Sequence, residues 1–131
     1  MKEESEVQQE VQIKAMHYGC NLMRNNCGCL LDDTGRPVRY GLGNVSKKHQ
    51  EKIASSDLIG ITKVVVTQEM VGMTLGIFTA VEVKKEAWNP NKKLDKRETA
   101  QNNFINWVRS MGGIAGFANS VDKLKEIFNQ Q

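Results

Sequence analysis

The sequence predicts an α/β fold in which a mixed central β-sheet is flanked by helices. Three observations support this prediction. Helical periodicity occurs near the N-terminus, again over residues 97–111 and near the C-terminus, whereas strand-like patterns fill the segments between them. Residues 75–84 alternate between two faces at the period of a β-strand. A helical pattern also separates that strand from the last one, which is typical of a crossover connection.

Length and composition bound the class of protein. A chain of 131 residues fits one domain, residues 1–131, and its 18 basic and 15 acidic residues give a net charge of +3. This charge is compatible with a nucleic-acid partner but does not establish one. No apolar run reaches the roughly 18 residues of a membrane span, and the N-terminus is charged, so we expect a cytoplasmic protein without a membrane partner.

The first half of the chain is predicted to contain one helix and several strands. Ser5 is a typical N-cap, and residues 6–18 show helical spacing that ends at Gly19, so we expect an amphipathic helix there. Its apolar face consists of Val7, Val11, Ala15 and Tyr18. The expected strands are residues 21–25, 28–31 and 36–40, with turn chemistry at residues 32–35 making a hairpin of the last two.

The second half is predicted to end in a helix, a strand and a helix. Residues 41–56 are polar and suggest a loop with a short helix, after which Asp57 precedes a short apolar strand. The remaining expected elements are a turn at residues 68–72, a mobile polar connection at 88–93, a helix at 97–111, a strand at 114–118 and a last helix capped by Ser120.

The alternation in residues 75–84 places a carboxylate and a lysine on the same face of a strand. Leu75, Ile77, Val81 and Val83 form the apolar row, and Glu82 and Lys84 lie on the opposite face. Two carboxylates that converge from neighbouring strands, here Asp57 and Glu82, would suit a hard cation such as Mg²⁺. A nearby lysine can polarise a water or stabilise developing negative charge. A magnesium-dependent nuclease is therefore the first hypothesis.

The ordered motifs resemble those of the VRR-NUC group of PD-(D/E)xK nucleases, in its small standalone phage-type form. The matching residues are Glu6, Gln9, Arg24 to Asn26, Gly28, Ser56 to Gly60, Glu82 to Lys84, Gln101, Phe104, Ile105, Gly112 to Ala115 and Ser120. The resemblance covers nearly the whole chain and implies a restriction-endonuclease-like fold. One departure is Ser56, which stands where the family usually has a proline before the catalytic aspartate.

The resemblance implies a metal-dependent phosphodiesterase that uses Mg²⁺ or Mn²⁺. In this family pattern Asp57 and Glu82 bind the metal, Val83 contributes its backbone carbonyl, and Lys84 acts on the attacking water. The first-helix glutamate of the family maps to Glu6, although Glu10 lies one turn further along the same face and stays open as an alternative. The family glutamine that faces the active site corresponds to Gln101.

The expected partner is DNA, and the expected oligomer is a homodimer. Small standalone members of the family look like dimers, whose twofold axis suits symmetrical incision of branched DNA such as a four-way junction. Such an enzyme would act in phage replication or recombination inside the host cell. Basic side chains that we expect to contact phosphates are Arg24, Arg36, Arg39, Lys47, Lys48 and Lys85. Trp88, Trp107 or the last helix could supply an apolar patch for dimerisation.

Two other functions fit the same residues. The chain could be a catalytically silent DNA-binding or assembly subunit with a nuclease fold, or a restriction-type nuclease that reads bases. His17 and His49 are expected to have no catalytic part. The three cysteines are odd in number and lack C-x-x-C spacing, so we expect reduced thiols without a disulfide or a zinc site.

Overall fold

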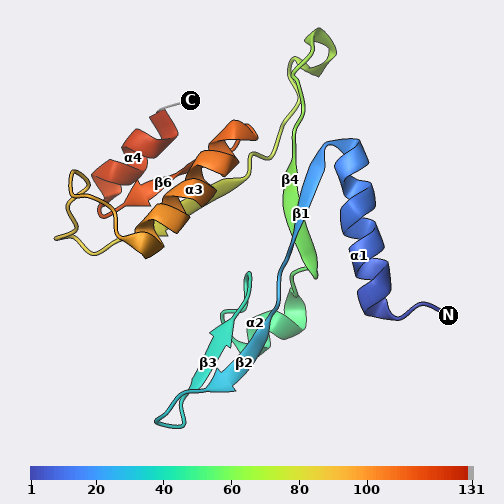
Figure 1. Cartoon of the computed structure of the whole chain (residues 1–131), viewed down its shortest axis with the longest axis horizontal. Helices are drawn as coiled ribbons and strands as arrows, with labels where there is room; N and C mark the ends of the chain where they lie inside the picture. The colour runs from blue at the N-terminus through green and yellow to red at the C-terminus, as the bar shows by residue number, and fades with distance from the viewer. Residues whose placement is uncertain (130–131) are drawn as a thin grey trace. The chain divides into compact units, whose positions relative to one another are not determined.

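The computed structural model describes residues 1–129 and confirms a mixed α/β structure (Figure 1). Its contacts divide the chain into two compact units, Met1–Thr62 (unit 1) and Lys63–Gln131 (unit 2). Within residues 1–129 the strands pair into three two-stranded sheets, β1 with β4, β2 with β3, and β5 with β6. The sequence predicted one central sheet, whereas hydrogen bonds join these strands only in pairs.

Unit 1 begins with helix α1 (Glu4–Ala15), which continues as the 3₁₀ turn η1 (Met16–Tyr18). Gly19 ends it in the left-handed conformation, with φ of 74°, as the sequence predicted. The predicted N-cap is wrong, because Glu3 takes that position and Ser5 lies inside the first turn. The backbone N–H of Glu3 donates to Glu6 Oε2 at 2.9 Å, which is the reciprocal bond of a capping box.

The predicted apolar face of α1 is not the face that unit 1 covers. Val7 and Val11 are each 44% exposed and Tyr18 is more exposed still, whereas Gln8, Gln12 and Ala15 are partly buried. The side-chain amide of Gln12 donates to the carbonyl of Leu22 in β1 at 3.3 Å. A hydrogen bond to a strand therefore sets the orientation of this helix within the unit, in place of an apolar stripe.

The rest of unit 1 consists of two antiparallel strand pairs and a short helix. Strand β1 (Cys20–Arg24) pairs with β4 (Leu58–Thr62). Strands β2 (Gly28–Leu31) and β3 (Pro37–Tyr40) form the predicted hairpin. Helix α2 (Lys47–Lys52) begins at Ser46, whose hydroxyl accepts from the His49 backbone at 3.1 Å. The predicted loop with a short helix is thus confirmed.

Unit 2 is built around a parallel pair of strands with a helical crossover. A 3₁₀ turn, η2 (Gln68–Met70), precedes β5 (Thr79–Val83), and helix α3 (Lys96–Ser110) then leads to β6 (Ile114–Ala118). Strands β5 and β6 run parallel, with Glu82 beside Phe117, which confirms the predicted crossover. The last helix, α4 (Val121–Asn129), begins after Ser120, whose hydroxyl accepts from the Lys123 backbone at 3.1 Å.

The core of unit 2 lies between the two helices and β6. Its buried members are Ile105, Val108, Ala115, Ala118 and Ile127. Val108 of α3 is fully buried, and a Cβ added to Gly116 of β6 would lie 2.8 Å from the side chain of Ile127. The absence of a side chain at position 116 therefore lets α4 pack directly on the strand.

Strand β5 is shorter than the sequence predicted. It begins at Thr79, so Leu75 and Ile77 lie before it and are nearly half exposed, and Val83 at its end is 75% exposed. The more covered side chains are those of the opposite face, Glu82 and Lys84, because α3 lies over them.

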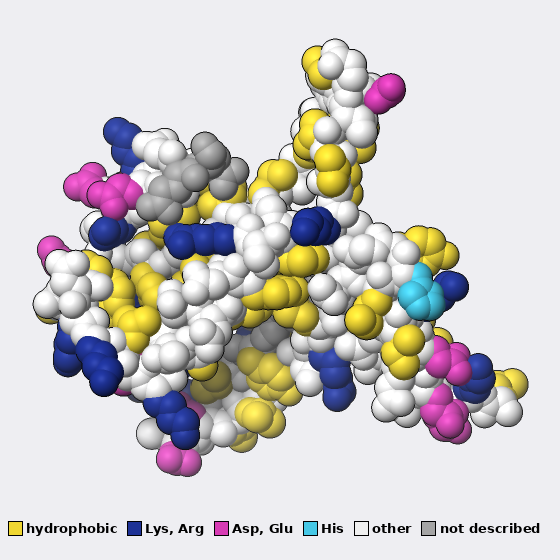
Figure 2. Space-filling model, turned by 45° about the horizontal axis from the view of Figure 1, so that its top comes forward, with side chains coloured by type: hydrophobic (Ala, Val, Ile, Leu, Met, Phe, Trp, Pro, Cys, Tyr) yellow, Lys and Arg dark blue, Asp and Glu magenta, His cyan; other side chains and the backbone are white. Residues whose placement is uncertain are grey.

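Figure 2 shows apolar side chains, in yellow, on the surface of the molecule, and residues 64–77 contribute several of them.

None of the helices within residues 1–129 combines the length and the hydrophobicity that a membrane span requires.

Gly60 permits the close approach of β4 to β1. A Cβ added to Gly60 would lie 1.9 Å from the carbonyl oxygen of Asn21, and backbone atoms on both strands would have to separate. We therefore expect Gly60→Ala to destabilise the protein by about 1–3 kcal/mol, measured by urea denaturation. Gly76→Ala is the control, because nothing lies within 4 Å of its added Cβ. Equal unfolding midpoints for the two variants would contradict this account.

Candidate active site

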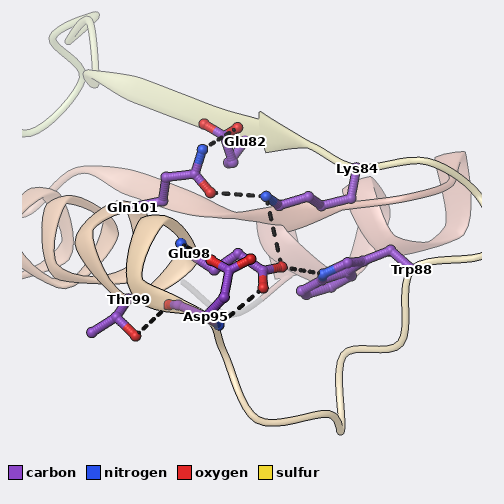
Figure 3. Close-up of polar contacts among 7 residues, drawn as sticks. All are labelled: Glu82, Lys84, Trp88, Asp95, Glu98, Thr99 and Gln101. Carbon is purple, nitrogen blue, oxygen red and sulfur yellow. Dashed lines mark hydrogen bonds and ion pairs between the residues drawn. The ribbon is translucent and has the colours of Figure 1, made fainter.

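A chain of polar contacts joins β5 to α3 within unit 2 (Figure 3). The side-chain amide nitrogen of Gln101 donates to Glu82 Oε1 at 2.8 Å. The amide oxygen of the same Gln101 accepts from Lys84 Nζ, also at 2.8 Å. Three of the residues predicted from the sequence are therefore brought together, with the glutamine as the bridge between the carboxylate and the ammonium group.

The local structure explains why these side chains meet. Glu82 and Lys84 are two residues apart at the end of β5, so both point to the face that α3 covers. Gln101 lies in the second turn of α3, one turn after Glu98, so the two helix side chains share a face. The crossover that a parallel strand pair requires places this helix face over Glu82 and Lys84.

Glu98 extends the chain of contacts, and the sequence reasoning did not identify it. Its Oε2 atom lies 3.8 Å from Lys84 Nζ, and the side chains of Lys84 and Glu98 are 16% and 15% exposed. The indole nitrogen of Trp88 donates to the same oxygen at 2.5 Å. The only sequence signal was Asp95 with Glu98 three positions later, which is a capping-box pattern and indicates a helix start.

Residues 88–93 were predicted to be a mobile connection, and Trp88 at the start of this segment makes specific contacts. Its ring packs against Phe117 of β6, with ring centroids 5.2 Å apart. The side-chain amide of Asn119 donates to the carbonyls of Glu86 and Trp88, both at 3.1 Å. Contacts from the end of β6 therefore hold Trp88 beside Glu98.

Asp57 is the predicted metal ligand that belongs to unit 1. It immediately precedes β4, its side chain is exposed, and its carbonyl accepts from the Asn25 backbone at 2.8 Å. The Asn25 side chain also donates to the carbonyl of Ser56 at 2.9 Å and to the hydroxyl of Ser55 at 2.8 Å. Asn25 thus fixes the backbone path from which the Asp57 carboxylate projects into solvent.

The two first-helix glutamates are both exposed and both engaged locally. Glu6 accepts from the Glu3 backbone, and Glu10 accepts from Lys2 Nζ at 2.6 Å. The contacts within unit 1 therefore give Glu6 a helix-capping part and Glu10 a surface ion pair.

The basic residues predicted to contact DNA are mostly exposed. The exposed members are Arg24, Arg36, Lys47 and Lys48 in unit 1 and Lys85 in unit 2. Arg39 differs, since it is partly buried and its Nε atom has no hydrogen-bond partner among the described residues. An unpaired buried donor is costly, so a bound acceptor at Arg39 would be favourable.

The oxygen atoms that unit 2 offers are compatible with Mg²⁺, which binds through few protein oxygens. Within residues 1–129, no three side chains of the His, Cys, Asp or Glu type gather into a metal-binding group. Mg²⁺ does not require one, because it commonly binds through one or two carboxylates plus waters and substrate phosphate. Glu82 offers a carboxylate, oriented by Gln101, and Val83 offers a carbonyl at the end of β5.

A cavity lies next to the Glu82–Gln101 contact. Its volume is about 390 Å³, and its polar lining comes from Glu82, Gln101 and Arg97, with Phe104 among the apolar residues. The predicted apolar helix residue Phe104 is 40% exposed and contacts Trp107, with ring centroids 5.7 Å apart. Glu82 and Gln101 therefore border a cavity whose lining is otherwise mostly apolar.

The N-terminus of α3 carries a carboxyl group whose titration is shifted. The backbone N–H of Glu98 lowers the pKa of Asp95 from its ordinary value of 3.8, and desolvation opposes this shift. The side chain of Glu98 and the positive charge of Lys84 also lower it, the latter least. The ionised Asp95 is therefore part of what holds the start of α3, where negative charge is favoured.

Comparison of the chain with protein-family models, with curated proteins and with solved structures found no match.

The lowered pKa of Asp95 predicts a pH-dependent contribution to stability. Its ionised form stabilises the fold above the ordinary pKa of 3.8, and this contribution is lost as the pH falls through the lowered value. Asp95→Asn keeps a good N-cap residue but removes the charge. We expect the variant to melt below the unaltered protein at pH 7 and to match it near pH 2. A melting-temperature difference that stays constant over this range would contradict the assignment.

Proposed function

We propose that the chain is a metal-dependent endonuclease that hydrolyses DNA phosphodiester bonds with Mg²⁺ or Mn²⁺. The observation that carries the proposal is the Gln101 bridge, which holds Glu82 and Lys84 on one face at 2.8 Å each. A carboxylate, a neutral amide and an ammonium group in this order suit phosphate hydrolysis, since they can hold a cation, a phosphate oxygen and a water side by side. The family resemblance agrees with this chemistry and with a restriction-endonuclease-like fold.

The residues have separate parts in the proposed reaction. The divalent cation, when bound, supplies positive charge to the scissile phosphate and acidifies a water. Glu82 is the carboxylate ligand in unit 2, and Val83 adds its carbonyl. Lys84 Nζ holds the attacking water or a phosphate oxygen through hydrogen bonds. The family resemblance alone assigns metal-ligand parts to Asp57 and to Glu6 or Glu10.

Gln101 orients both charged partners. Its amide nitrogen donates to Glu82 and its amide oxygen accepts from Lys84. If the amide group were rotated by half a turn, the oxygen would face the Glu82 carboxylate and the nitrogen would face the Lys84 ammonium group, and both contacts would be unfavourable. Because Gln101 lies between them, the Lys84 ammonium group does not pair directly with the Glu82 carboxylate. Without Gln101, two oppositely charged side chains on one strand face would pair with each other, and the carboxylate would be less available to a cation.

The proposed substrate is branched DNA, such as a four-way junction, cut by a homodimer. The exposed basic residues of unit 1 and Lys85 would contact phosphates, which position a duplex without reading its bases. We therefore propose cutting that depends on DNA shape rather than sequence. Cleavage of linear duplex at preferred sequences would favour the restriction-type alternative.

We expect Lys84→Ala and Glu82→Gln each to reduce cleavage of a labelled four-way junction by about a hundredfold or more in Mn²⁺. The first removes positive charge beside the scissile phosphate, and the second replaces the carboxylate that would hold the cation. Lys125→Ala is the control, as it removes an exposed lysine of α4. Junction binding, measured by fluorescence anisotropy in EDTA, should change by less than about threefold for Lys84→Ala, since a single phosphate contact contributes little to total affinity.

Two outcomes would contradict this proposal. Undiminished cleavage by Lys84→Ala would remove the lysine from the mechanism. Junction binding without any metal-dependent product from the unaltered protein would favour the catalytically silent subunit.

A further inference from the structure

We propose that Glu98 is a positioning residue for Lys84, and that Trp88 holds Glu98 in turn. The inference rests on the proposed function of Lys84 and adds residues that the sequence motifs do not include. It follows from the second oxygen of Glu98, which faces Trp88 and Lys84 together (Figure 3).

Only one of the two oxygens of the Glu98 carboxylate takes part in helix capping. Its Oε1 atom accepts from the Asp95 backbone at 3.1 Å, which is the reciprocal bond of a capping box. Its Oε2 atom accepts from the Trp88 indole at 2.5 Å and lies 3.8 Å from Lys84 Nζ. A capping box needs no charge at this position, because glutamine serves equally well. The charge of Glu98 is favoured at a helix N-terminus, as that of Asp95 is, and its Oε2 atom gives the charge a second use.

The surroundings of Lys84 define what that use is. Its ammonium group lies near three partners: the Gln101 amide oxygen at 2.8 Å, Glu98 Oε2 at 3.8 Å and the ring of Phe117, with the centroid at 5.4 Å. Among the described residues, Glu98 is the ion-pair partner of Lys84. Glu82 faces Lys84 from the same strand through Gln101, Asp95 adds negative charge from the start of α3, and β6 presents the Phe117 ring.

Burial shields this ion pair from much of the water that screens a surface pair. Exposed pairs contribute little because water screens them and because holding two long side chains costs conformational entropy. Lys84 and Glu98 are only 16% and 15% exposed, and the Trp88 hydrogen bond fixes the glutamate in advance. The lysine therefore gains an anionic partner that needs little ordering of its own, and its four-carbon chain is held in one direction.

The position of Glu98 also protects Glu82. Glu82 lies two residues from Lys84 on the same strand face, and Gln101 stands between the two side chains. Glu98 draws Lys84 towards the Trp88 and Phe117 side, so that Glu82 remains available to a cation.

The test compares Glu98→Gln, Trp88→Phe and a control, Glu126→Gln, in the full chain. Glu98→Gln keeps the side-chain shape and one acceptor oxygen but removes the charge, so that either the Asp95 or the Trp88 donor faces the amide nitrogen. Trp88→Phe keeps an aromatic ring against Phe117 but removes the indole donor. Glu126→Gln removes the same charge from an ion pair with Lys123 on α4, at 3.0 Å.

The first measurement needs neither DNA nor metal. The rate at which an amine-reactive ester acylates Lys84 is followed by peptide mass spectrometry. We expect a severalfold increase in Glu98→Gln, a smaller increase in Trp88→Phe and no change in Glu126→Gln, because only the first two release the ammonium group. Identical rates in Glu98→Gln and Glu126→Gln, with unchanged melting temperatures, would overturn the proposal.

The second measurement is junction cleavage in Mn²⁺. We expect Glu98→Gln to lower kcat by about tenfold or more while KM stays within about twofold. The reason is that Glu98 acts on the reaction through Lys84 and does not itself bind the substrate. If the variants differ in acylation as expected but the unaltered protein cuts no DNA, the nuclease proposal is refuted and the Glu98 inference stands. Normal acylation with normal cleavage in Glu98→Gln would refute the inference alone.

Discussion

The parallel pairing of β5 with β6 is the constraint on which the candidate site depends. Parallel neighbours cannot be joined by a tight turn, so the chain must cross over the sheet, and here it does so as α3. The helix that solves this connection problem also covers the strand face that carries Glu82 and Lys84. Its buried residues Ile105 and Val108 anchor it. The polar contacts of Gln101 and Glu98 are thus a consequence of topology.

Local chemistry was sufficient to predict much of the fold from the sequence. Gly19 ends the first helix because only a residue without a Cβ enters the left-handed region at little cost, and Ser120 begins the last helix because its hydroxyl can accept a backbone N–H. Period two placed Glu82 and Lys84 on one face. Such signals depend on neighbours within a few residues, and for that reason they could be predicted without tertiary information.

Apart from the N-cap of α1, which is Glu3 and not Ser5, the main errors concern contacts between segments distant in sequence. Alternation shows that a strand has two faces, but it does not say which face a helix will cover, and in β5 the charged face is the more covered one. The same limit applies to α1, where Gln12 rather than Val11 meets a strand. Glu98 and Trp88 were missed because each has an ordinary local explanation, a helix cap and a polar connection, and only the fold shows their second contacts.

The choice of glutamine at position 101 follows from the charges on either side of it. An ionised acid there would attract Lys84 but repel Glu82, and a base would do the reverse. A primary amide carries a donor and an acceptor on one planar group, so it satisfies both neighbours at 2.8 Å without adding charge. The negative charge that Lys84 needs then comes from Glu98, on its other side. In the function proposed above, this arrangement leaves the charge of Glu82 available to a divalent cation.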